Sequence, residues 1–412
     1  MFRKKTIVAL GLIVTCTFFF TIQYLLKFLP STEPRLKSNY QKIKEEIYKE
    51  FYSLTIKSPT QSLNKTEAFL SNLQDIAELR QLNYEELWLE AEMWPSSKQL
   101  TNISSPNVGK VWLALKTAKI VKADVDTRGT QLKFLLTLKG NQQSVFKPQW
   151  YDKSRLIEGP VYAGKDRYGS EITAFYLSVL LDKPMVPLSA ERTLSLKHDI
   201  MPVATKRLLN TSFEINNRTC VYGRCYYCHK EDPVCDDNQN SLTGAVILNV
   251  KKSFSNYRSP WQRTYKKGKL AAWETDPDYC KKVKSKLTKK RMFDLIDIAV
   301  FDFLIQNGDR HHYETFEDSI VWVDNGKGLG NPYVQHIDIL APLYQCCMMR
   351  RKLWLTLQYL AGGTLSRYLK LMPDIQNVLT DAHLTALEER LRLVLATVEY
   401  CRKKVGSDYK MN

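Results

Sequence analysis

The 412-residue sequence has no Gly-x-Gly-x-x-Gly run, so it lacks the glycine-rich loop that covers the phosphates in ordinary protein kinases. It has one Cys-x-x-Cys, Cys225-Tyr-Tyr-Cys228, without the second well-spaced pair that a zinc knuckle would need. Acidic residues are in deficit, 43 against 60 Lys and Arg, which gives a formal charge of +17. Such a charge favours an anionic partner, for example a nucleotide, an acidic glycan, an acidic protein or a membrane face, without choosing among them.

Charged residues are absent from positions 6 to 26, a mostly apolar run that is long enough to cross a bilayer as a helix. The run has no small-residue cleavage site, which is typical of a signal anchor rather than a signal peptide. Its basic flank, Met1-Phe-Arg-Lys-Lys5, should stay cytoplasmic. We therefore predict a cytoplasmic tail at 1–5, a transmembrane anchor at 6–29, and a single-pass type II protein whose remainder lies in the secretory lumen.

The cysteines and sequons agree with a luminal location. Cys16 lies in the apolar run, and the other eight cysteines form an even set, which in an oxidising lumen indicates four disulfides. The same compartment argues against zinc or redox chemistry for the cysteines between 220 and 235, which we interpret as a disulfide-stapled loop. Four sequons would be glycosylation acceptors at Asn64, Asn102, Asn210 and Asn217.

After a luminal stem at 30–65, the hydrophobic pattern changes from helical to strand-like spacing. We expect an N-terminal helical segment at 66–119 and a β-rich small lobe at 120–242 that includes the cysteine-rich loop. Strands are expected at 120–125, 131–138, 144–147 and in short runs within 185–210. The large lobe at 243–412 should be mainly helical, with a strongly apolar helix at 289–306 and further helices at 341–360 and 382–404.

Two acids stand in turns that follow apolar elements. Asp309 lies in the Asn307-Gly-Asp309 loop after the apolar helix, and Asp324 begins an Asp-Asn-Gly turn after the apolar residues 320–323. In phosphoryl transfer one such acid can orient and deprotonate a hydroxyl, while another holds the metal that bridges the nucleotide phosphates. Both strings are also ordinary turn signals, so they indicate catalysis only together with other residues.

Further candidates lie upstream of these turns. Lys147 is on the third strand of the small lobe, where a kinase places its phosphate-binding lysine, and the next helix begins near Asp166 and Glu171. An acid there can reach back to the lysine or the metal, although acids at a helix start also complement its dipole. The basic, aromatic segment 251–269 suits glycan binding or surface packing better than nucleic acid, which a luminal protein seldom meets.

The strings Asn307-Gly-Asp-Arg-His-His-Tyr-Glu-Thr-Phe316 and Asp324-Asn-Gly326 resemble the secreted, Golgi-resident kinases related to the Golgi casein kinase and to Four-jointed. Similar strings at 129–133, 146–148, 220–225, 273–280 and 345–347 extend the resemblance over roughly residues 105–405. It implies an α+β, divergent two-lobed protein-kinase-like fold with extra N-terminal helices and disulfide staples. Within the family, residues 157–166 and 339–347 resemble the glycosaminoglycan xylosylkinase branch.

The resemblance implies a role for each candidate residue. Asp309 would be the catalytic base, Asp324 and Asp166 would bind Mn²⁺ or Mg²⁺, and Glu171 would support the site from its helix. The ATP phosphates and adenine would be bound by Gln131, Lys133, Lys147, Ile247, Leu248, Asn249, Val250 and Glu314. The implied disulfides are Cys220 with Cys235, Cys225 with Cys228, Cys280 with Cys346, and Cys347 with Cys401.

The branch resemblance implies a Golgi kinase that transfers the γ-phosphate of ATP to the 2-hydroxyl of xylose in the linker between glycosaminoglycan chains and proteoglycan cores. Its acceptor partner would be the galactosyl-xylose of that linker. Two alternatives stay open: a secretory-pathway serine kinase of acidic motifs, and a catalytically inactive luminal activator or glycan-binding protein. The chain departs from the usual family pattern at Arg167-Tyr-Gly-Ser-Glu171 and Lys327-Gly-Leu-Gly330, which bears on how the Glu171 helix is positioned.

Overall fold

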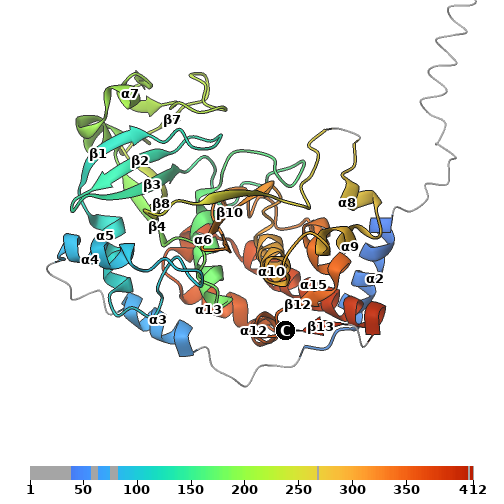
Figure 1. Ribbon diagram of the computed structural model, residues 1–412. Coiled ribbons are helices and arrows are strands. Elements are labelled where there is room, and N and C mark those ends of the chain that lie inside the picture. The colour runs from blue at the N-terminus through green and yellow to red at the C-terminus, as the bar shows by residue number, and fades with distance from the viewer. Residues whose placement is uncertain (1–38, 57–63, 75–81, 267–268, 407–408, 412) are drawn as a thin grey trace, which may run out of the picture. The chain divides into compact units, whose positions relative to one another are not determined.

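The largest sheet in the computed structural model has five antiparallel strands in the order β1-β2-β3-β8-β4 (Figure 1). The structure describes residues 39–56, 64–74, 82–266, 269–406 and 409–411. The five strands are β1 Ile120–Val125, β2 Phe134–Leu138, β3 Gln142–Pro148, β4 Ser189–Leu194 and β8 Leu242–Leu248. Because β8 pairs with both β3 and β4, the sheet of the small lobe continues past residue 242, the boundary expected from the sequence.

The helices α5 Val108–Thr117 and α6 Tyr168–Leu180 pack on this sheet. The earlier helices α3 Asn64–Gln74 and α4 Tyr84–Glu92 pack on α5. Both α5 and α6 contact β4 and β8. Every residue of α6 is buried, including Ser170 and Glu171, so the helix is held between the sheet and the large lobe element α10.

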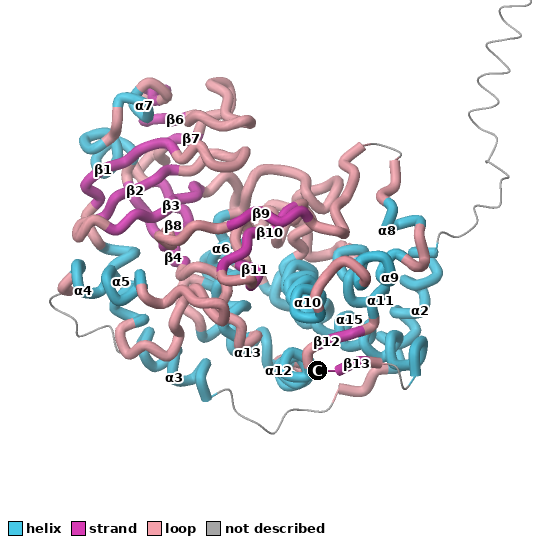
Figure 2. The backbone as a smooth tube through the Cα atoms, in the orientation of Figure 1, coloured by secondary structure: helices cyan, strands magenta, loops and turns pink. Residues whose placement is uncertain are grey.

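The five-stranded sheet lies in the small lobe, and most of the remaining helices lie in the large lobe (Figure 2). Its elements are β9 Ser255–Arg258, α8 Ala272–Thr275, α9 Tyr279–Lys284, α10 Lys289–Ile305, β10 His312–Phe316, β11 Ser319–Val321, η4 Ile337–Leu340, α11 Ala341–Cys346, β12 Met348–Met349, α12 Arg351–Leu360, α13 Thr364–Leu371, α14 Ile375–Val378, α15 Asp381–Val405 and β13 Lys410–Met411. Residues 292–305 of α10 are all buried, and α10 contacts α6, α11, α15 and β11. The helix expected at 341–360 is interrupted at Cys347, which has a positive φ of 46°.

A second layer of short elements follows β4. These are η2 Leu196–Ile200, η3 Met201–Val203, α7 Lys206–Leu209, β5 Ser212–Ile215, β6 Arg218–Val221 and β7 Val234–Cys235. The strand prediction for 185–210 therefore holds only for β4. The Asp236 carboxylate accepts the backbone N–H of Leu196 (2.9 Å) and of Lys197 (3.2 Å), which satisfies the start of η2 in place of a sheet partner.

The structure contains four disulfides, and they join the pairs that the family resemblance implies: Cys220–Cys235, Cys225–Cys228, Cys280–Cys346 and Cys347–Cys401. The first lies directly across the β6–β7 pair, and the second closes the tip of the same loop. The other two attach α11 and the residue after it to α9 and α15.

Residues before the small lobe are described in part. The helix α2 spans Asn39–Ser53, and its portion from Ile43 onward belongs to the same compact unit as the rest of the chain to Asn412. The Arg392 guanidinium on α15 donates to the carbonyls of Phe51 (3.2 Å) and Leu54 (3.0 Å), so part of the expected stem packs on the large lobe. Among the described residues no helix is long and apolar enough to span a membrane, and the anchor predicted at 6–29 lies outside them.

Candidate active site

Four charged groups from three elements converge at the centre of the site. The Lys147 ammonium, on β3, lies 2.6 Å from Glu171 Oε1 on α6, 3.1 Å from Asp166 Oδ2 and 2.9 Å from Asp324 Oδ1 after β11. Burial alone would lower the pKa of Lys147, but the three carboxylates raise it well above its ordinary value. The lysine is thus held as a cation, as the phosphate-binding lysine of a kinase must be, with Glu171 as its partner from the helix.

The backbone of the Asp324 turn is fixed by α6. Asp324 has a positive φ of 60°, and the next N–H, of Asn325, donates to Glu171 Oε1 at 3.0 Å. The Ser170 hydroxyl donates to the Asn325 carbonyl at 2.7 Å. This leaves the Asp324 side chain 73% exposed in the cleft, where the Lys147 ammonium holds its pKa well below the usual range. Asp324 therefore presents an exposed, ionised carboxylate in the cleft.

A cavity of about 240 Å³ adjoins this cluster. Of the residues predicted to bind the nucleotide, its lining includes Lys133, Lys147, Glu171, Ile247, Leu248, Asn249, Val250, Glu314 and Asp324. The apolar edge comes from the end of β8 and the residues after it, and the charged end comes from β3, α6 and the Asp324 turn. The lining thus has an apolar side suited to a base and a charged side whose lysines, Lys133 and Lys147, suit phosphates.

Two of the residues predicted to bind the metal or the phosphates, Asp166 and Gln131, do not line this cavity. Asp166 is buried beside it and contacts it through Lys147; a Cβ at Gly326 would stand 2.6 Å from its Oδ2, so only glycine leaves room for this carboxylate. Gln131 is buried and is absent from the lining. Its predicted contact with the phosphates stays a prediction.

Asp309 lies in the loop after α10, beyond the Lys147 cluster. The helix ends at Gln306 in a left-handed conformation (φ 57°), which turns the chain into the loop. The Tyr265 hydroxyl donates to Asp309 Oδ1 at 2.8 Å, and the Asp309 side chain is 31% exposed. Burial raises the pKa of Asp309 above its ordinary value, which brings it nearer to that of an effective general base.

A buried ion pair braces this loop. The Arg310 guanidinium donates to both oxygens of Asp302 on α10, at 2.9 and 2.7 Å, and to the Asn325 side-chain oxygen at 2.8 Å. One arginine thus ties together the helix, the loop of Asp309 and the turn of Asp324. Sequence reasoning missed Asp302, Arg310 and Asn325. An acid within an otherwise apolar helix face is the signal by which Asp302 could have been found.

Sequence reasoning also missed residues on the small-lobe side of the cavity. Arg128 makes a bidentate contact with Asp126, with its Nε 2.9 Å from Oδ1 and its Nη2 2.7 Å from Oδ2, and its Nη1 lies 3.4 Å from Asn249 Oδ1. This pair links the loop containing Gly129 to the apolar edge of the cavity. The loop around Gly129 is therefore stabilised by the ion pair between Arg128 and Asp126 as well as by the glycine turn.

The carboxylates present suit a hard divalent cation that is shared with a nucleotide. Asp166 and Asp324 offer oxygen donors on either side of one ammonium group, the donor type that Mg²⁺ and Mn²⁺ prefer. Within the described part of the chain, no group of three or more His, Cys, Asp and Glu is arranged to hold a metal alone. Two carboxylates are enough where substrate phosphates complete the coordination, which is the usual arrangement in kinases.

Comparisons with known proteins agree with this geometry. The family model described as "Golgi casein kinase, C-terminal, Fam20" matches residues 86–410. Human glycosaminoglycan xylosylkinase is 43% identical over 334 residues, which cover 78% of this chain and 81% of the relative. A Drosophila melanogaster glycosaminoglycan xylosylkinase homolog is 41% identical, with 76% and 77% covered. Human pseudokinase FAM20A is 31% identical, with 80% and 68% covered, so the relatives include a protein named as catalytically inactive.

Solved structures show the same fold. The structure of hydra Fam20 with sugar matches with a TM-score of 0.74 and 37% identity, covering 81% of this chain and 99% of that one. The crystal structure of the Golgi casein kinase with Mn/ADP bound matches with a TM-score of 0.71 at 24% identity, covering 92% and 94%. The predicted two-lobed, kinase-like fold of the α+β class is thereby confirmed.

Proposed function

The chain belongs to the Fam20 family of Golgi casein kinase-like proteins, and from this premise we propose that it is an ATP-dependent kinase that phosphorylates the 2-hydroxyl of xylose in the glycosaminoglycan linkage region. The proposal is supported chiefly by four charged residues that meet beside one cavity: Lys147, Asp166, Glu171 and Asp324. Asp309 lies in the loop that follows α10. Relatives named for this activity, over 40% identical, support the choice of acceptor.

Nucleotide binding follows from the two sides of the cavity. The adenine would lie against residues 247–250, and the phosphates would lie toward Lys133 and Lys147. Burial is the main cause that lowers the pKa of Lys133, and the charge of Lys147 adds to it. The Lys133 ammonium group has no ion pair or hydrogen bond in the described part of the chain, and it lines the cavity. A phosphate placed between the two ammonium groups would relieve this repulsion, so Lys133 is suited to bind ATP rather than a protein carboxylate.

The reaction would be an in-line transfer. The xylose 2-hydroxyl oxygen forms a bond to the γ-phosphorus, the bond to the β,γ-bridging oxygen breaks, and ADP leaves with that electron pair. Asp309 accepts the hydroxyl proton on Oδ1 or Oδ2, and Tyr265 and Arg310 keep its loop in place. A divalent cation held by Asp324 and Asp166 would neutralise the phosphate charge that develops.

We also propose that the kinase works in the Golgi lumen, anchored by residues 6–29 as a type II protein with a cytoplasmic tail at 1–5. Four disulfides suit an oxidising compartment. Of the proposed glycan acceptors, Asn64, Asn210 and Asn217 are exposed, and Asn102 is half-buried. Phosphorylation at this point would promote assembly of glycosaminoglycan chains on proteoglycan cores.

The test uses the purified full-length protein with ATP and Mn²⁺. It would be offered galactosyl-β1,4-xylose on a simple aglycone and, separately, an acidic serine peptide, with product mass measured for each. Phosphate on the disaccharide, absent with Asp309→Asn, is the expected result. Phosphate on the peptide alone would replace the proposal with a serine kinase, as one relative, 35% identical, is named. Transfer to neither acceptor would indicate an inactive protein.

A further inference from the structure

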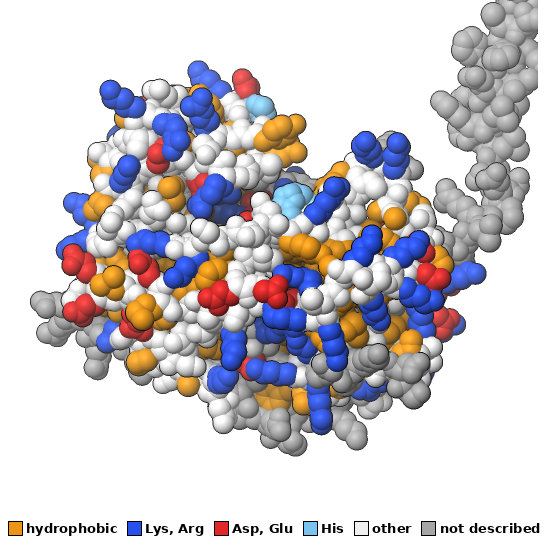
Figure 3. All heavy atoms as spheres, viewed as in Figure 1, with side chains coloured by type: hydrophobic (Ala, Val, Ile, Leu, Met, Phe, Trp, Pro, Cys, Tyr) orange, Lys and Arg blue, Asp and Glu red, His pale blue; other side chains and the backbone are white. Residues whose placement is uncertain are grey.

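A dense basic segment lies in the large lobe, outside the residues that line the nucleotide cavity. Residues 281–291, Lys-Lys-Val-Lys-Ser-Lys-Leu-Thr-Lys-Lys-Arg, contain seven cations, and no acid occurs between Asp278 and Asp294. The segment comprises most of α9, a short linker and the first turn of α10. Lys281, Lys282, Lys284, Lys286, Lys289 and Lys290 are exposed. Figure 3 shows Lys and Arg side chains gathering over the region of α9, α10 and α12.

The start of α12 adds to this segment. The Arg350 guanidinium lies 3.4 Å from the Lys290 carbonyl and 2.6 Å from Asp294 Oδ1, which places the two helix starts side by side. Arg351 and Lys352 follow and are exposed. We define the basic surface as Lys281, Lys282, Lys284, Lys286, Lys289, Lys290, Arg291, Arg350, Arg351 and Lys352.

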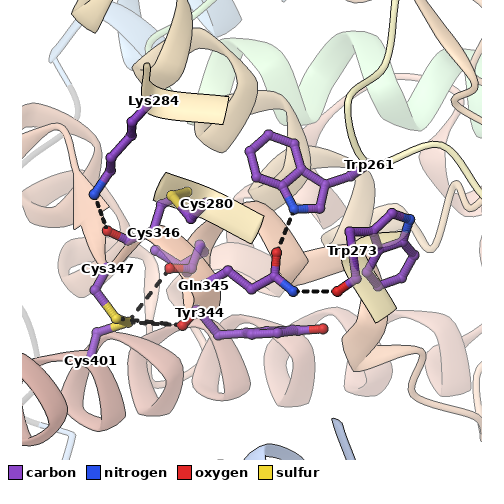
Figure 4. Close-up of a disulfide and its surroundings, with 10 residues drawn as sticks. Trp261, Trp273, Cys280, Lys284, Tyr344, Gln345, Cys346, Cys347 and Cys401 are labelled. Carbon is purple, nitrogen blue, oxygen red and sulfur yellow. Dashed lines mark hydrogen bonds between the residues drawn. A yellow bond between two sulfur atoms is a disulfide. The ribbon is translucent and has the colours of Figure 1, made fainter. Parts of the chain in front are cut away.

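The backbone under the basic surface is held by a disulfide. Cys280, immediately before Lys281, is bonded to Cys346 on α11, and the Lys284 ammonium donates to the Cys346 carbonyl at 3.0 Å (Figure 4). The neighbouring Cys347–Cys401 bond attaches the same turn to α15. The cations are thus presented from a fixed framework, which lowers the entropy lost when they bind a partner.

Ion pairs within the chain engage part of the basic surface. Among the described residues, the acids in these pairs are Asp182, Asp276, Asp278, Asp294, Asp297 and Asp318. Lys286 and Arg351 have no ion pair among the described residues. Several of the pairs are exposed, and such pairs exchange readily for an external anion.

The helix dipole does not explain the positions of all the cations on α9 and α10. Cations at the end of α9 complement its dipole, but Lys289, Lys290 and Arg291 occupy the first turn of α10, where no acid is present. Positive charge at a helix N-terminus opposes the dipole, and an anion there is favourable. The dipole of α10 therefore disfavours these cations, two of which, Lys290 and Arg291, form ion pairs with Asp294 and Asp318. An external polyanion would offset the remaining cost.

We propose that the basic surface binds an anionic polysaccharide chain, of the sulfated or carboxylated kind that is built on a phosphorylated linker. The choice of a glycan over an acidic protein rests on the proposed function, because such chains are built on the acceptor linker after its phosphorylation. The surface shares no residue with the nucleotide cavity lining, so chain binding and phosphoryl transfer use separate groups. The bound chain would keep the enzyme near further linkers on the same proteoglycan.

The test compares two variants of the full-length protein that lose equal charge. The surface variant is Lys281→Gln/Lys282→Gln/Lys286→Gln. The control is Lys122→Gln/Lys197→Gln/Lys206→Gln, three exposed small-lobe lysines with no ion pair in the described chain. Heparin affinity is measured against salt concentration for each. The surface variant should bind about tenfold or more weakly with a shallower salt dependence, and the control should stay within about twofold of the parent.

Equal weakening of both variants would overturn the proposal, because it would indicate a general charge effect. Tighter binding of the parent protein to polyglutamate than to heparin would also overturn it and indicate an acidic protein partner. Phosphorylation of the free disaccharide should be unchanged in both variants, since none of the substituted lysines lines the active site. If the parent phosphorylates no sugar but the heparin difference persists, the proposed function fails and the surface assignment stands.

Discussion

The Ser170 hydroxyl occupies the space in which a side chain at position 328 would lie: a Cβ on Gly328 would stand 2.3 Å from Ser170 Oγ. The same hydroxyl donates to the Asn325 carbonyl at 2.7 Å. Both positions fall in the strings where this chain departs from the usual family pattern. The two departures therefore meet in space and fit one another, and together they join α6, which carries Glu171, to the turn of Asp324.

This contact predicts a rescue experiment. Gly328→Ala should destabilise the protein by about 1–3 kcal/mol through overpacking against Ser170 and should raise the KM for ATP. Adding Ser170→Ala should recover part of both losses, because the clashing oxygen is removed; the Ile305 carbonyl, 3.0 Å from the new Cβ, limits the recovery. Urea unfolding and initial rates measure the two effects.

The matched control for this pair is Gly330→Ala. Its Cβ would come no nearer than 3.3 Å to a neighbour, the end of the Arg167 side chain. We expect a smaller loss of stability than for Gly328→Ala and no rescue by Ser170→Ala. Losses that simply add in the Ser170→Ala/Gly328→Ala protein would show that the two residues are not coupled.

Substitution of Asp309 should impair turnover, whereas substitution of Asp324 should impair metal-dependent nucleotide binding. Asp309→Asn should lower kcat by about 10²–10⁴-fold while ATP still binds, because only the proton acceptor is lost. Asp324→Asn should instead abolish the Mn²⁺ dependence of nucleotide binding. Titration calorimetry with ATP, with and without Mn²⁺, separates the two. Normal Mn²⁺-dependent binding by Asp324→Asn would exclude it as a metal ligand.

The acid limb of the pH profile should report the contact between Tyr265 and Asp309. The active form of Asp309 is the carboxylate, so kcat/KM falls as pH falls through its pKa, which burial raises above the ordinary Asp range. The Tyr265 hydroxyl lowers that pKa by donating to the carboxylate. Tyr265→Phe should therefore raise the pKa and move the acid limb to higher pH.

Tyr162→Phe is the control for this effect. Its ring lies 4.9 Å from the Tyr265 ring, and the substitution keeps the Tyr265 hydroxyl on Asp309. Its acid limb should match that of the parent protein. An unchanged limb in Tyr265→Phe would mean that the hydroxyl leaves Asp309 before the proton is transferred.

Local patterns predicted the elements that carry the site. The apolar residues of 289–306 and the alternation at 144–147 predicted α10 and β3, because the burial of these elements is reflected directly in their residue types. The turns around Asp309 and Asp324 were predicted from their Asn, Gly and Asp residues. The kinase-like order of lysine strand and helix suggested Asp166 and Glu171 as partners of Lys147. That Asp324 meets them followed only from the family resemblance, because it lies 177 positions from the lysine.

Two features of the fold depend on contacts between residues that are far apart in the sequence. The start of η2 at Leu196 is held by Asp236, some forty residues later, which accepts the N–H groups of Leu196 and Lys197. Likewise, the break at Cys347 accompanies two adjacent disulfides that attach to different helices. The local sequence around 185–210 and 341–360 does not reveal these distant partners. The local patterns therefore predicted strands in the first segment and a continuous helix in the second.

The buried pair of Asp302 and Arg310 should contribute more to stability than any exposed pair. Asp302→Asn leaves the Arg310 guanidinium buried without its counter-charge, because an arginine stays protonated. Removing one partner of such a pair costs about 3–5 kcal/mol. Activity should fall as well, since the same guanidinium holds Asn325 and the loop of Asp309.

Asp318→Asn is the matched control, because Asp318 pairs with Arg291 at the same 2.7 Å but its side chain is 70% exposed. Loss of an exposed pair should cost about 1 kcal/mol or less. Urea unfolding of the three proteins measures the difference. Equal stability of Asp302→Asn and Asp318→Asn would mean that water or another group reaches Arg310, and the brace between α10 and the catalytic loop would then need another origin.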